Sequence, residues 1–216
     1  MISNELEATL RRWVDIEEIK EVQSRYQHLL HMYDWDGIVN LFAKNAPDVS
    51  AEIGQSGLFV GAEGINRFFT QRLPSPRRGK KGTLLLHIAV NPLIEVSKDG
   101  KTATGVWHGP GIYIGTDRGR PEADITLGKY GCDFIKEDGK WKFLHFKWYN
   151  FAKLPSFWEQ KPEQGGVGIS LREAYADYAP DKPGAIPAGY DPNRVENTPL
   201  PPLPSQSDDG DATGRG

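Results

Sequence analysis

Hydrophobic and polar residues alternate through two consecutive runs in the middle of the chain, residues 83–97 and 102–116. The turn between them contains Asp99-Gly100, and an Asp-Gly pair between apolar runs is a strong hairpin signal because both residues tolerate a positive φ angle. The pattern therefore predicts two long antiparallel strands. His87 and Asn91 lie four positions apart on the first strand, so we expect both side chains on one face of the sheet.

The same pattern recurs nearer the C-terminus. Residues 123–137 and 140–151 also alternate, and a second Asp-Gly pair, Asp138-Gly139, joins them. Two consecutive hairpins predict an antiparallel sheet of four long strands. Shorter strands are expected earlier in the chain, at 49–53 and 58–60.

The N-terminal third has the spacing of helices. Ser3 is expected to cap a short helix that presents Trp13, and Asp15 with Glu18 resembles a capping box that begins a second helix. Apolar and aromatic residues recur at helical spacing along this second helix, namely Ile16, Ile19, Val22, Tyr26, Leu29, Leu30 and Tyr33. Further short helices are predicted at 34–43, where Asp34 is expected to be the N-cap, and at 65–73.

Helices followed by a sheet are typical of the α+β class. We expect the sheet to curve over the N-terminal helices as a cone-shaped barrel with a cavity inside. Beyond about residue 155 the chain becomes rich in Pro and Gly, and such a segment cannot bury a core of its own. The expected organisation is a cone domain at 1–154, an extended arm at 155–204 that packs on the domain or on a neighbouring subunit, and a disordered tail at 205–216.

Composition and charge narrow the function classes. The chain of 216 residues is 38% hydrophobic, which suffices for a sizeable core. Its formal net charge of −3 does not favour nucleic-acid binding, which is typical of basic proteins. No apolar run approaches the roughly 18 residues of a membrane span, and the charged N-terminus lacks a signal-peptide core, so we expect a cytoplasmic protein. A single cysteine, Cys132, excludes an internal disulfide and a multi-cysteine metal site.

Four segments carry a family resemblance by their order and spacing: DIEEIKEVQSRYQHLLHMYDWDGIVNLFAKNA, GLFVGAEGINRFF, LHIAVNPLIEVSKDGKTATGVW and GKYGCDFIKEDGKWKFLHF. Over roughly residues 15–151 the chain resembles the SnoaL-like branch of the nuclear-transport-factor-two-like superfamily. The resemblance implies an α+β cone whose mouth accepts small, mostly apolar molecules. Members include scytalone dehydratase, bile acid 7α-dehydratase, ketosteroid isomerases, polyketide cyclases and dioxygenase small subunits, so the resemblance implies the fold more strongly than the reaction.

The resemblance also implies catalytic positions. His87 falls where scytalone dehydratase-like enzymes keep a catalytic histidine, and Tyr26 where bile acid dehydratase-like proteins keep a tyrosine. These families usually place an aspartate where this chain has His31, so a partner that orients His87 is expected from Glu52, His31 or Asn91. The catalytic candidates are therefore His87, Tyr26, His31 and Glu52.

The chemistry of these side chains can be stated without the family. An imidazole takes and returns a proton near neutral pH, a phenol such as Tyr26 or Tyr113 can donate a hydrogen bond to a carbonyl or departing hydroxyl, and Lys147 is a possible counter-ion for an enolate. None of these steps requires a cofactor. The residues expected to contact substrate are Asn91, Tyr113, Trp107, Tyr130, His145 and Lys147.

These groups predict a cofactor-independent lyase that acts on a hydrophobic, aromatic or polycyclic small molecule by dehydration or by retro-aldol C–C cleavage, for example of a lignin-type diaryl compound. Two alternatives stay open: an isomerase or cyclase that uses the same pocket, and a non-catalytic binding or small-subunit module of a ring-hydroxylating dioxygenase. The apolar outer face of the sheet predicts a homo-oligomer, a dimer or a trimer.

Structural interpretations of the same residues also stay open. A histidine in a sheet is often a structural residue whose ring nitrogens are already hydrogen-bonded. Lys147 can point to solvent. A shift of one residue in the short strand would move Glu52 to the other face. A zinc or iron site formed by His87, His145, His31 and Glu52 is the main alternative to acid–base catalysis, although their spacing does not require it, and we expect no metal.

Overall fold

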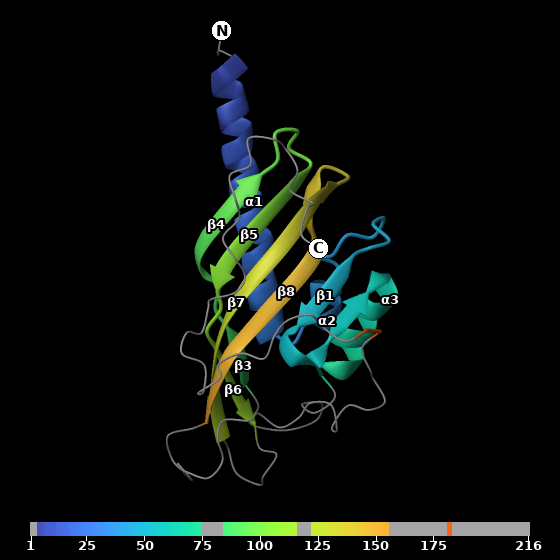
Figure 1. The fold of residues 1–216 in the computed structure, drawn as a ribbon, viewed down its shortest axis with the longest axis vertical. Coiled ribbons are helices and arrows are strands. Elements are labelled where there is room, and N and C mark those ends of the chain that lie inside the picture. Colours follow the sequence, from blue (N-terminus) through green and yellow to red (C-terminus); the bar gives the residue numbers. More distant parts are fainter. Residues whose placement is uncertain (1–3, 75–83, 116–121, 156–180, 183–216) are drawn as a thin grey trace.

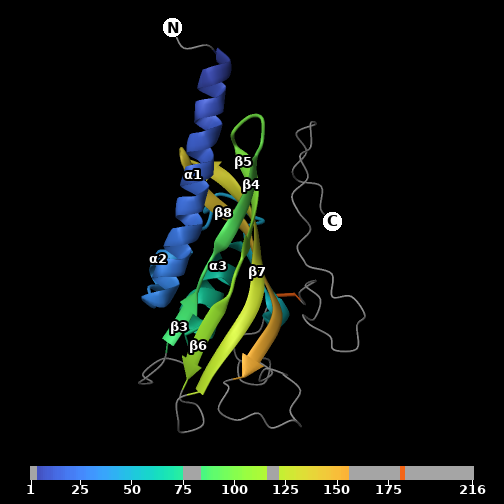
Figure 2. The same ribbon diagram turned by 90° about the vertical axis from the view of Figure 1, so that its left-hand side faces the viewer.

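The computed structural model describes residues 4–74, 84–115, 122–155 and 181–182, and it confirms the predicted α+β class (Figure 1). A long, twisted sheet that does not close is covered on one face by helix α1, as Figure 2 shows from the side. In chain order the elements are α1 (Asn4–His31), α2 (Trp35–Val39), β1 (Ser50–Ile53), η1 (Gly54–Ser56), β2 (Leu58–Val60), α3 (Gly61–Asn66), η2 (Arg67–Arg72), β3 (Leu84–His87), β4 (Val90–Val96), β5 (Thr102–His108), β6 (Gly111–Gly115), β7 (Glu122–Glu137) and β8 (Lys140–Pro155).

Helix α1 is one continuous helix, whereas the sequence pattern predicted two helices that meet at Asp15. The helix contains neither Gly nor Pro, so nothing in its backbone interrupts it. Asp15 does not cap a helix, because its buried carboxylate accepts a hydrogen bond from Trp141 Nε1 at 2.9 Å and pairs with Lys136. The predicted capping box is therefore wrong, and Asp15 instead ties α1 to the β7–β8 hairpin.

Each of the first two predicted long strands is divided into two. The run 83–97 forms β3 and β4, and the run 102–116 forms β5 and β6, with the second break at Gly109-Pro110. Proline cannot donate a ladder hydrogen bond, and Asn91 opposite the break has a φ angle of 54° with a shift of register beside it. As a result β4 pairs with β5, while β3 pairs with β6.

Both predicted Asp-Gly turns are confirmed. Gly100 has a φ angle of 66° in the turn between β4 and β5, and Asp138 and Gly139 have φ angles of 51° and 73° between β7 and β8. Positive φ angles at both positions, as in the second turn, are typical of the two-residue hairpin turn, whereas in the first turn Gly100 alone of the pair has a positive φ angle.

The strand order is β2-β1-β8-β7-β5-β4, and the β3–β6 pair joins the N-terminal half of β7. The sheet is mixed rather than purely antiparallel, because β1 lies parallel to β8. Hairpin signals predict only antiparallel neighbours, so the sequence pattern held no sign of this long-range parallel pairing.

The core between α1 and the sheet is largely aromatic. Neighbouring rings meet at centroid distances from 4.7 to 6.3 Å, mostly tilted or edge-on, as expected for packed aromatic side chains. The fully buried phenylalanines are Phe42, Phe59, Phe69, Phe134, Phe143 and Phe146. No helix in the described parts of the chain combines the length and apolarity of a membrane span.

Two residues of the predicted C-terminal arm lie against the domain. The Leu58 amide donates to the Lys182 carbonyl oxygen at 3.3 Å, and the Val60 amide donates to the Asp181 carboxylate at 3.0 Å. Asp181 also forms an ion pair with Arg67. The contact adds a single antiparallel bridge to the free edge of β2. The other residues of the arm, and the tail that was predicted after it, lie outside the described residues.

Candidate functional site

The break between β3 and β4 places His87 at the end of a strand, facing the buried phenol of Tyr130 on β7. The Nδ1 atom of His87 lies 2.6 Å from the Tyr130 hydroxyl oxygen. Tyr130 is fully buried, and burial, with a smaller contribution from neighbouring Tyr26, raises the pKa of its phenol well above the ordinary value. The phenol therefore keeps its proton at neutral pH and can either donate to Nδ1 or accept from Nδ1–H.

Three glycines allow the rings of this site to rest directly on the backbone. A Cβ atom on Gly111, which lies opposite His87, would be 2.8 Å from the His87 ring, and one on Gly109 would be 2.6 Å from the Tyr130 ring. A Cβ atom on Gly128 would be 3.1 Å from Trp148 Nε1. The Gly109-Pro110-Gly111 motif therefore both breaks the strand and makes room for the site.

Tyr26 reaches the same place from helix α1. Its ring centroid is 6.0 Å from that of Tyr130 and 4.7 Å from that of Phe146. Burial raises the pKa of the Tyr26 phenol far above its ordinary value, so this group also remains a neutral hydrogen-bond donor. His87, Tyr130 and Tyr26 thus form one connected cluster between the helix and the sheet.

Buried polar atoms without a partner lie beside this cluster. Trp148 lies against His87 with ring centroids 4.9 Å apart and ring planes tilted by 40°, and its Nε1 atom has no hydrogen-bond partner among the described residues. The same holds for Asn150 Oδ1 and for both amide atoms of Gln27, although the Gln27 amide lies close enough to lower the pKa of Tyr130 somewhat. Buried polar groups in proteins normally have hydrogen-bond partners. These side-chain atoms are therefore suited to bind polar atoms of a bound molecule or of water.

The pairing of β7 with β8 shows why these groups face the same way. Tyr130 lies directly opposite Trp148, and Gly128 directly opposite Asn150. Directly opposed residues project to the same face of a sheet, which here is the face that α1 covers. Trp107 lies opposite Tyr130 on its other side and is buried there against Phe134.

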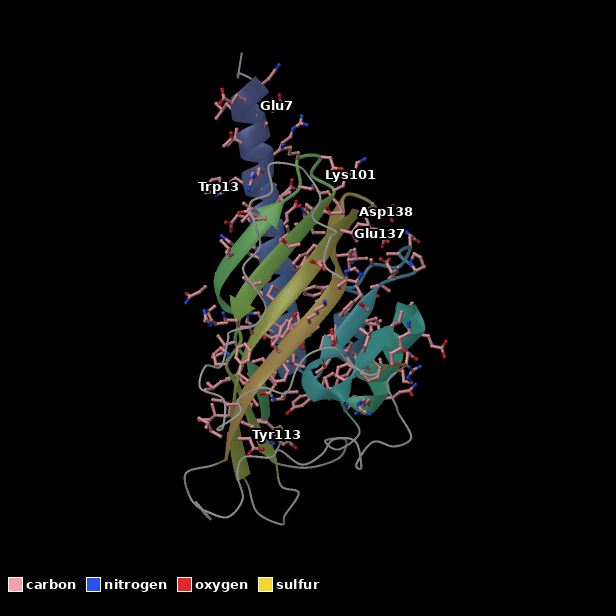
Figure 3. All side chains as sticks on the ribbon, viewed as in Figure 1. Glu7, Trp13, Lys101, Tyr113, Glu137 and Asp138 are labelled. Carbon is pink, nitrogen blue, oxygen red and sulfur yellow. The ribbon has the colours of Figure 1, made fainter. Side chains whose placement is uncertain are left out.

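A second set of polar groups continues along this face. Tyr113 lies opposite Asp124 on β7, and Asp124 forms an ion pair of 2.6 Å with Lys153. Figure 3 labels Tyr113 near the end of β6, far from the tip of the β7–β8 hairpin. Neither Asp124 nor Lys153 stands out in the sequence, because charged residues near the ends of strands are usually solvated.

Three predicted site residues, Glu52, Lys147 and His145, lie on the opposite face of the sheet. Glu52 faces Lys147 across the β1–β8 pair, while the neighbouring Phe146 is buried in the core. His145 Nδ1 lies 3.1 Å from Asp133 and its Nε2 atom 3.5 Å from Asp48. The hydrogen bond to Asp133 raises the pKa of His145.

Regular alternation along this strand would place His145 on the same face as Phe143. A shift of register between Asp133 and Phe134 puts one extra residue into β8 at this point, so Phe143 points inward and His145 outward. The assignment of His145 to the inner wall is therefore not supported, because a bulge reverses the alternation that the assignment assumed.

His31 and Asn91 also lie away from His87. His31 is exposed in the last turn of α1, and Asn91 is exposed beyond the break after β3. Asn91 lines a shallow hollow of about 360 Å³ on the outer face, together with Val90, His108, Pro110, Leu127, Gly128 and Phe151. The expected common face for His87 and Asn91 assumed an unbroken strand, which the structure does not have.

Tyr130, which was assigned to substrate binding, takes the place beside His87 Nδ1 where a carboxylate, a histidine or Asn91 was expected. Gln27, Trp148 and Asn150 were missed. The alternation of strand β8 could have identified two of them. If Phe146 is taken as a core residue, Trp148 and Asn150, two and four positions later, are expected on the same face. Within the described residues, no three His, Cys, Asp or Glu side chains lie close enough to hold a metal ion.

Comparison with known proteins agrees with this architecture. The family model for the SnoaL-like domain matches residues 11–147. A candidate scytalone dehydratase from Novosphingobium aromaticivorans DSM 12444 is 17% identical with a TM-score of 0.59, over 87% of this chain and 99% of its own.

Two further solved structures have the same fold. A type 2 hexachlorocyclohexane dehydrochlorinase (LinA) is 16% identical with a TM-score of 0.59, over 74% of this chain and 99% of its own. An NTF2-like protein with a cystatin-like fold from N. aromaticivorans is 17% identical with a TM-score of 0.54, over 69% of this chain and 91% of its own.

Proposed function

The chain belongs to the SnoaL-like domain family, and we propose that it is a cofactor-independent lyase that acts by acid–base chemistry on a hydrophobic, aromatic small molecule. The observation that carries this proposal is the 2.6 Å contact between His87 and the buried phenol of Tyr130. It combines a group that exchanges protons near neutral pH with a neutral group that fixes its orientation.

The neighbouring folds support the lyase class. A dehydrochlorinase and a dehydratase, as their names state, both remove a small molecule from a larger one and leave a double bond. Such eliminations need a base at carbon and a means to stabilise the departing group. Both functions can be assigned to residues of this cluster.

In the proposed reaction His87 acts as the base. With Nδ1 held by Tyr130, the Nε2 atom takes a proton from the carbon next to the one that bears a hydroxyl group. The electron pair of the broken C–H bond forms the new C=C bond, and the C–O bond breaks. The imidazolium then returns its proton to the departing hydroxide, so the products are an alkene and one molecule of water.

Tyr26 and the polar side chains beside the cluster are assigned to substrate binding and to the stabilisation of developing negative charge. The neutral phenol of Tyr26 donates a hydrogen bond to the departing oxygen or to a carbonyl group that becomes negatively charged. The Trp148 indole N–H and the Gln27 amide are further donors, and Asn150 Oδ1 is an acceptor. A substrate with an oxygen acceptor and a hydroxyl donor on an otherwise apolar ring skeleton matches this set. The same groups serve a retro-aldol cleavage if His87 takes the hydroxyl proton instead.

Turnover of a small substrate panel tests the proposal. Purified protein is incubated with aryl compounds that carry a hydroxyl group β to a carbonyl, and the conjugated product is followed by absorbance and by the loss of one water in mass spectrometry. His87→Ala is expected to lower kcat/KM by about 10²- to 10⁴-fold, which is the usual contribution of a general base. His145→Gln is the matched control, because it removes a histidine from the outer face of the same sheet.

Three results would contradict the proposal. The first is no turnover with any member of the panel, and the second is full activity of His87→Ala. The third is a product of unchanged mass, which would indicate an isomerase that returns the proton to a different carbon.

A further inference from the structure

We propose that the first three turns of α1 form a docking surface for a second copy of this chain, with the two helices antiparallel. Figures 1 and 2 show that the N-terminal end of α1 extends beyond the end of the sheet, and Arg12 in the third turn lies level with the end of β4, where it pairs with Glu95. The proposal does not depend on the reaction that the interior site performs.

The projecting turns carry an apolar stripe that faces solvent. Leu6, Leu10 and Trp13 are spaced four and three residues apart, so they lie along one side of the helix. Their exposed fractions are 48%, 43% and 65%, and that of the adjacent Val14 is 55%. Figure 3 shows Trp13 pointing away from the strands. A tryptophan this exposed beside three other large apolar side chains is unusual for the surface of a monomer.

The charges beside the stripe indicate which partner fits. Glu5 and Glu7 lie in the first turns, and Arg11 and Arg12 lie one to two turns later. An antiparallel copy related by a two-fold axis places the acidic end of each helix against the basic end of the other. A parallel copy would place like charges together, so the helix is complementary to itself in one orientation only.

The register follows from the same spacing. With the two-fold axis between residues 9 and 10, Leu6 of each helix packs against Trp13 of the other, and Glu7 flanks this contact near the level of Arg11 of the other helix. The ion pair that Glu7 and Arg11 now form within one helix lies on the surface, whereas Arg12 pairs with Glu95 of β4 on the side that faces the sheet. Surface ion pairs contribute at most about 1 kcal/mol each, so they can rearrange when a partner docks.

The size of the surface sets the expected strength. The eleven residues from 4 to 14 span about 16 Å of helix, and two such segments bury less than the roughly 800 Å² per partner of a standard interface. We therefore expect a dimer that exchanges with the monomer, with a dissociation constant on the order of micromolar or weaker.

Analytical ultracentrifugation over micromolar to submillimolar concentrations tests the proposal. The average mass of the full chain is expected to rise from one copy towards two, and Trp13→Glu is expected to remain monomeric. Met32→Glu is the matched control, because Met32 is 72% exposed just beyond the other end of α1. Circular dichroism confirms that each variant is folded.

Charge reversal tests the orientation. A variant with Glu5→Lys and Glu7→Lys, and a variant with Arg11→Glu and Arg12→Glu, should each be monomeric alone and should form a mixed dimer when combined. A chain that carries all four reversals should dimerise again, because its ends remain complementary in the antiparallel orientation. A wild-type chain that stays monomeric, or an oligomer that Trp13→Glu does not weaken, would overturn the proposal.

Discussion

The imidazole of His87 is held by a buried phenol, since its Nδ1 atom lies 2.6 Å from the hydroxyl oxygen of Tyr130. The resemblance to the family led us to expect Glu52, His31 or Asn91 in this place. A neutral phenol fixes the ring as a carboxylate does, but it adds no full negative charge beside the imidazolium. The orienting group thus comes from strand β7 rather than from β1, α1 or β4, where Glu52, His31 and Asn91 lie.

Replacement of Tyr130 by Phe removes this hydrogen bond and keeps the ring. We expect kcat to fall about 5- to 100-fold with little change in KM, because the loss of one buried hydrogen bond costs roughly 1–3 kcal/mol. Steady-state kinetics on the substrate found in the panel provide the measurement.

A double-mutant cycle separates this positioning role from a structural one. If Tyr130 acts through His87, the pair His87→Ala and Tyr130→Phe should lose no more activity than His87→Ala alone. Additive losses would show that the two residues act independently and would contradict the assignment.

Substitution of Gly111 by Ala tests the close approach of His87 to the backbone. The new Cβ atom would lie 2.8 Å from the His87 ring and 2.7 Å from Thr126 Oγ1, so one of these side chains has to move. We expect a loss of about 1–3 kcal/mol in the free energy of unfolding, together with a fall in activity.

A glycine elsewhere provides the control for Gly111. Gly139 has a φ angle of 73°, which strains any other residue but asparagine least, and a Cβ atom added there would meet no other atom within 4 Å, so Gly139→Asn should keep activity at a cost in stability of about 1 kcal/mol. Wild-type activity of Gly111→Ala would show that the ring of His87 can shift without consequence for the reaction.

The sequence predicted local features well, because local signals set them. The Asp99-Gly100 and Asp138-Gly139 turns require only residues that tolerate positive φ angles, and both turns are present. Asp34 was predicted to cap a helix, and its side chain accepts a hydrogen bond from the Gly37 amide at 2.8 Å. These interactions join residues that are close in sequence.

The wrong predictions have a different origin. They concern the sheet face on which a side chain lies, or a hydrogen bond to a residue that is distant in the sequence. Asp15 resembled a cap, but Trp141 lies within hydrogen-bond distance only after folding. One extra residue in β8 moved His145 from the inner to the outer face, and the strand break before Asn91 separated it from His87. Alternation fixes relative faces only while a strand is unbroken, so a single bulge changes every assignment beyond it.

Asp181→Asn is expected to loosen the contact between the C-terminal segment and β2. Although partial burial acts to raise the pKa of Asp181, the hydrogen bonds from the Val60 amide and Arg67 outweigh it and lower the pKa. Loss of the charge weakens both bonds, since hydrogen bonds to a charged group are about twice as strong as neutral ones.

Amide hydrogen exchange measures this change. Exchange at Leu58 and Val60 should become several-fold faster in Asp181→Asn, because their amides donate to Lys182 and Asp181. The Gly61 amide, which donates to the Val49 carbonyl oxygen at 2.7 Å, is the internal control. Unchanged exchange at Val60 would show that the edge of β2 is protected without Asp181.

His145 is expected to make stability depend on pH. Its hydrogen bond to Asp133, with the charge of Asp48 nearby, outweighs partial burial and the repulsion of Lys147 and raises the pKa of the imidazole above its ordinary value near 6.5. The folded chain therefore binds the proton more tightly than the unfolded chain. This contribution is fully present below the unfolded pKa and is lost as the pH rises through the folded pKa.

Urea unfolding of the wild type and of His145→Gln between pH 5 and 9 measures the contribution. The wild type should be the more stable of the two at the acid end, by no more than about 1 kcal/mol because the pair is partly exposed, and the difference should shrink as the pH rises. Asp133→Asn should remove most of the same pH-dependent difference, because Asp133 is the principal partner of His145. A difference that grows with pH would mean that the folded state binds the His145 proton less tightly than the unfolded chain, which would contradict the outward-facing ion pair.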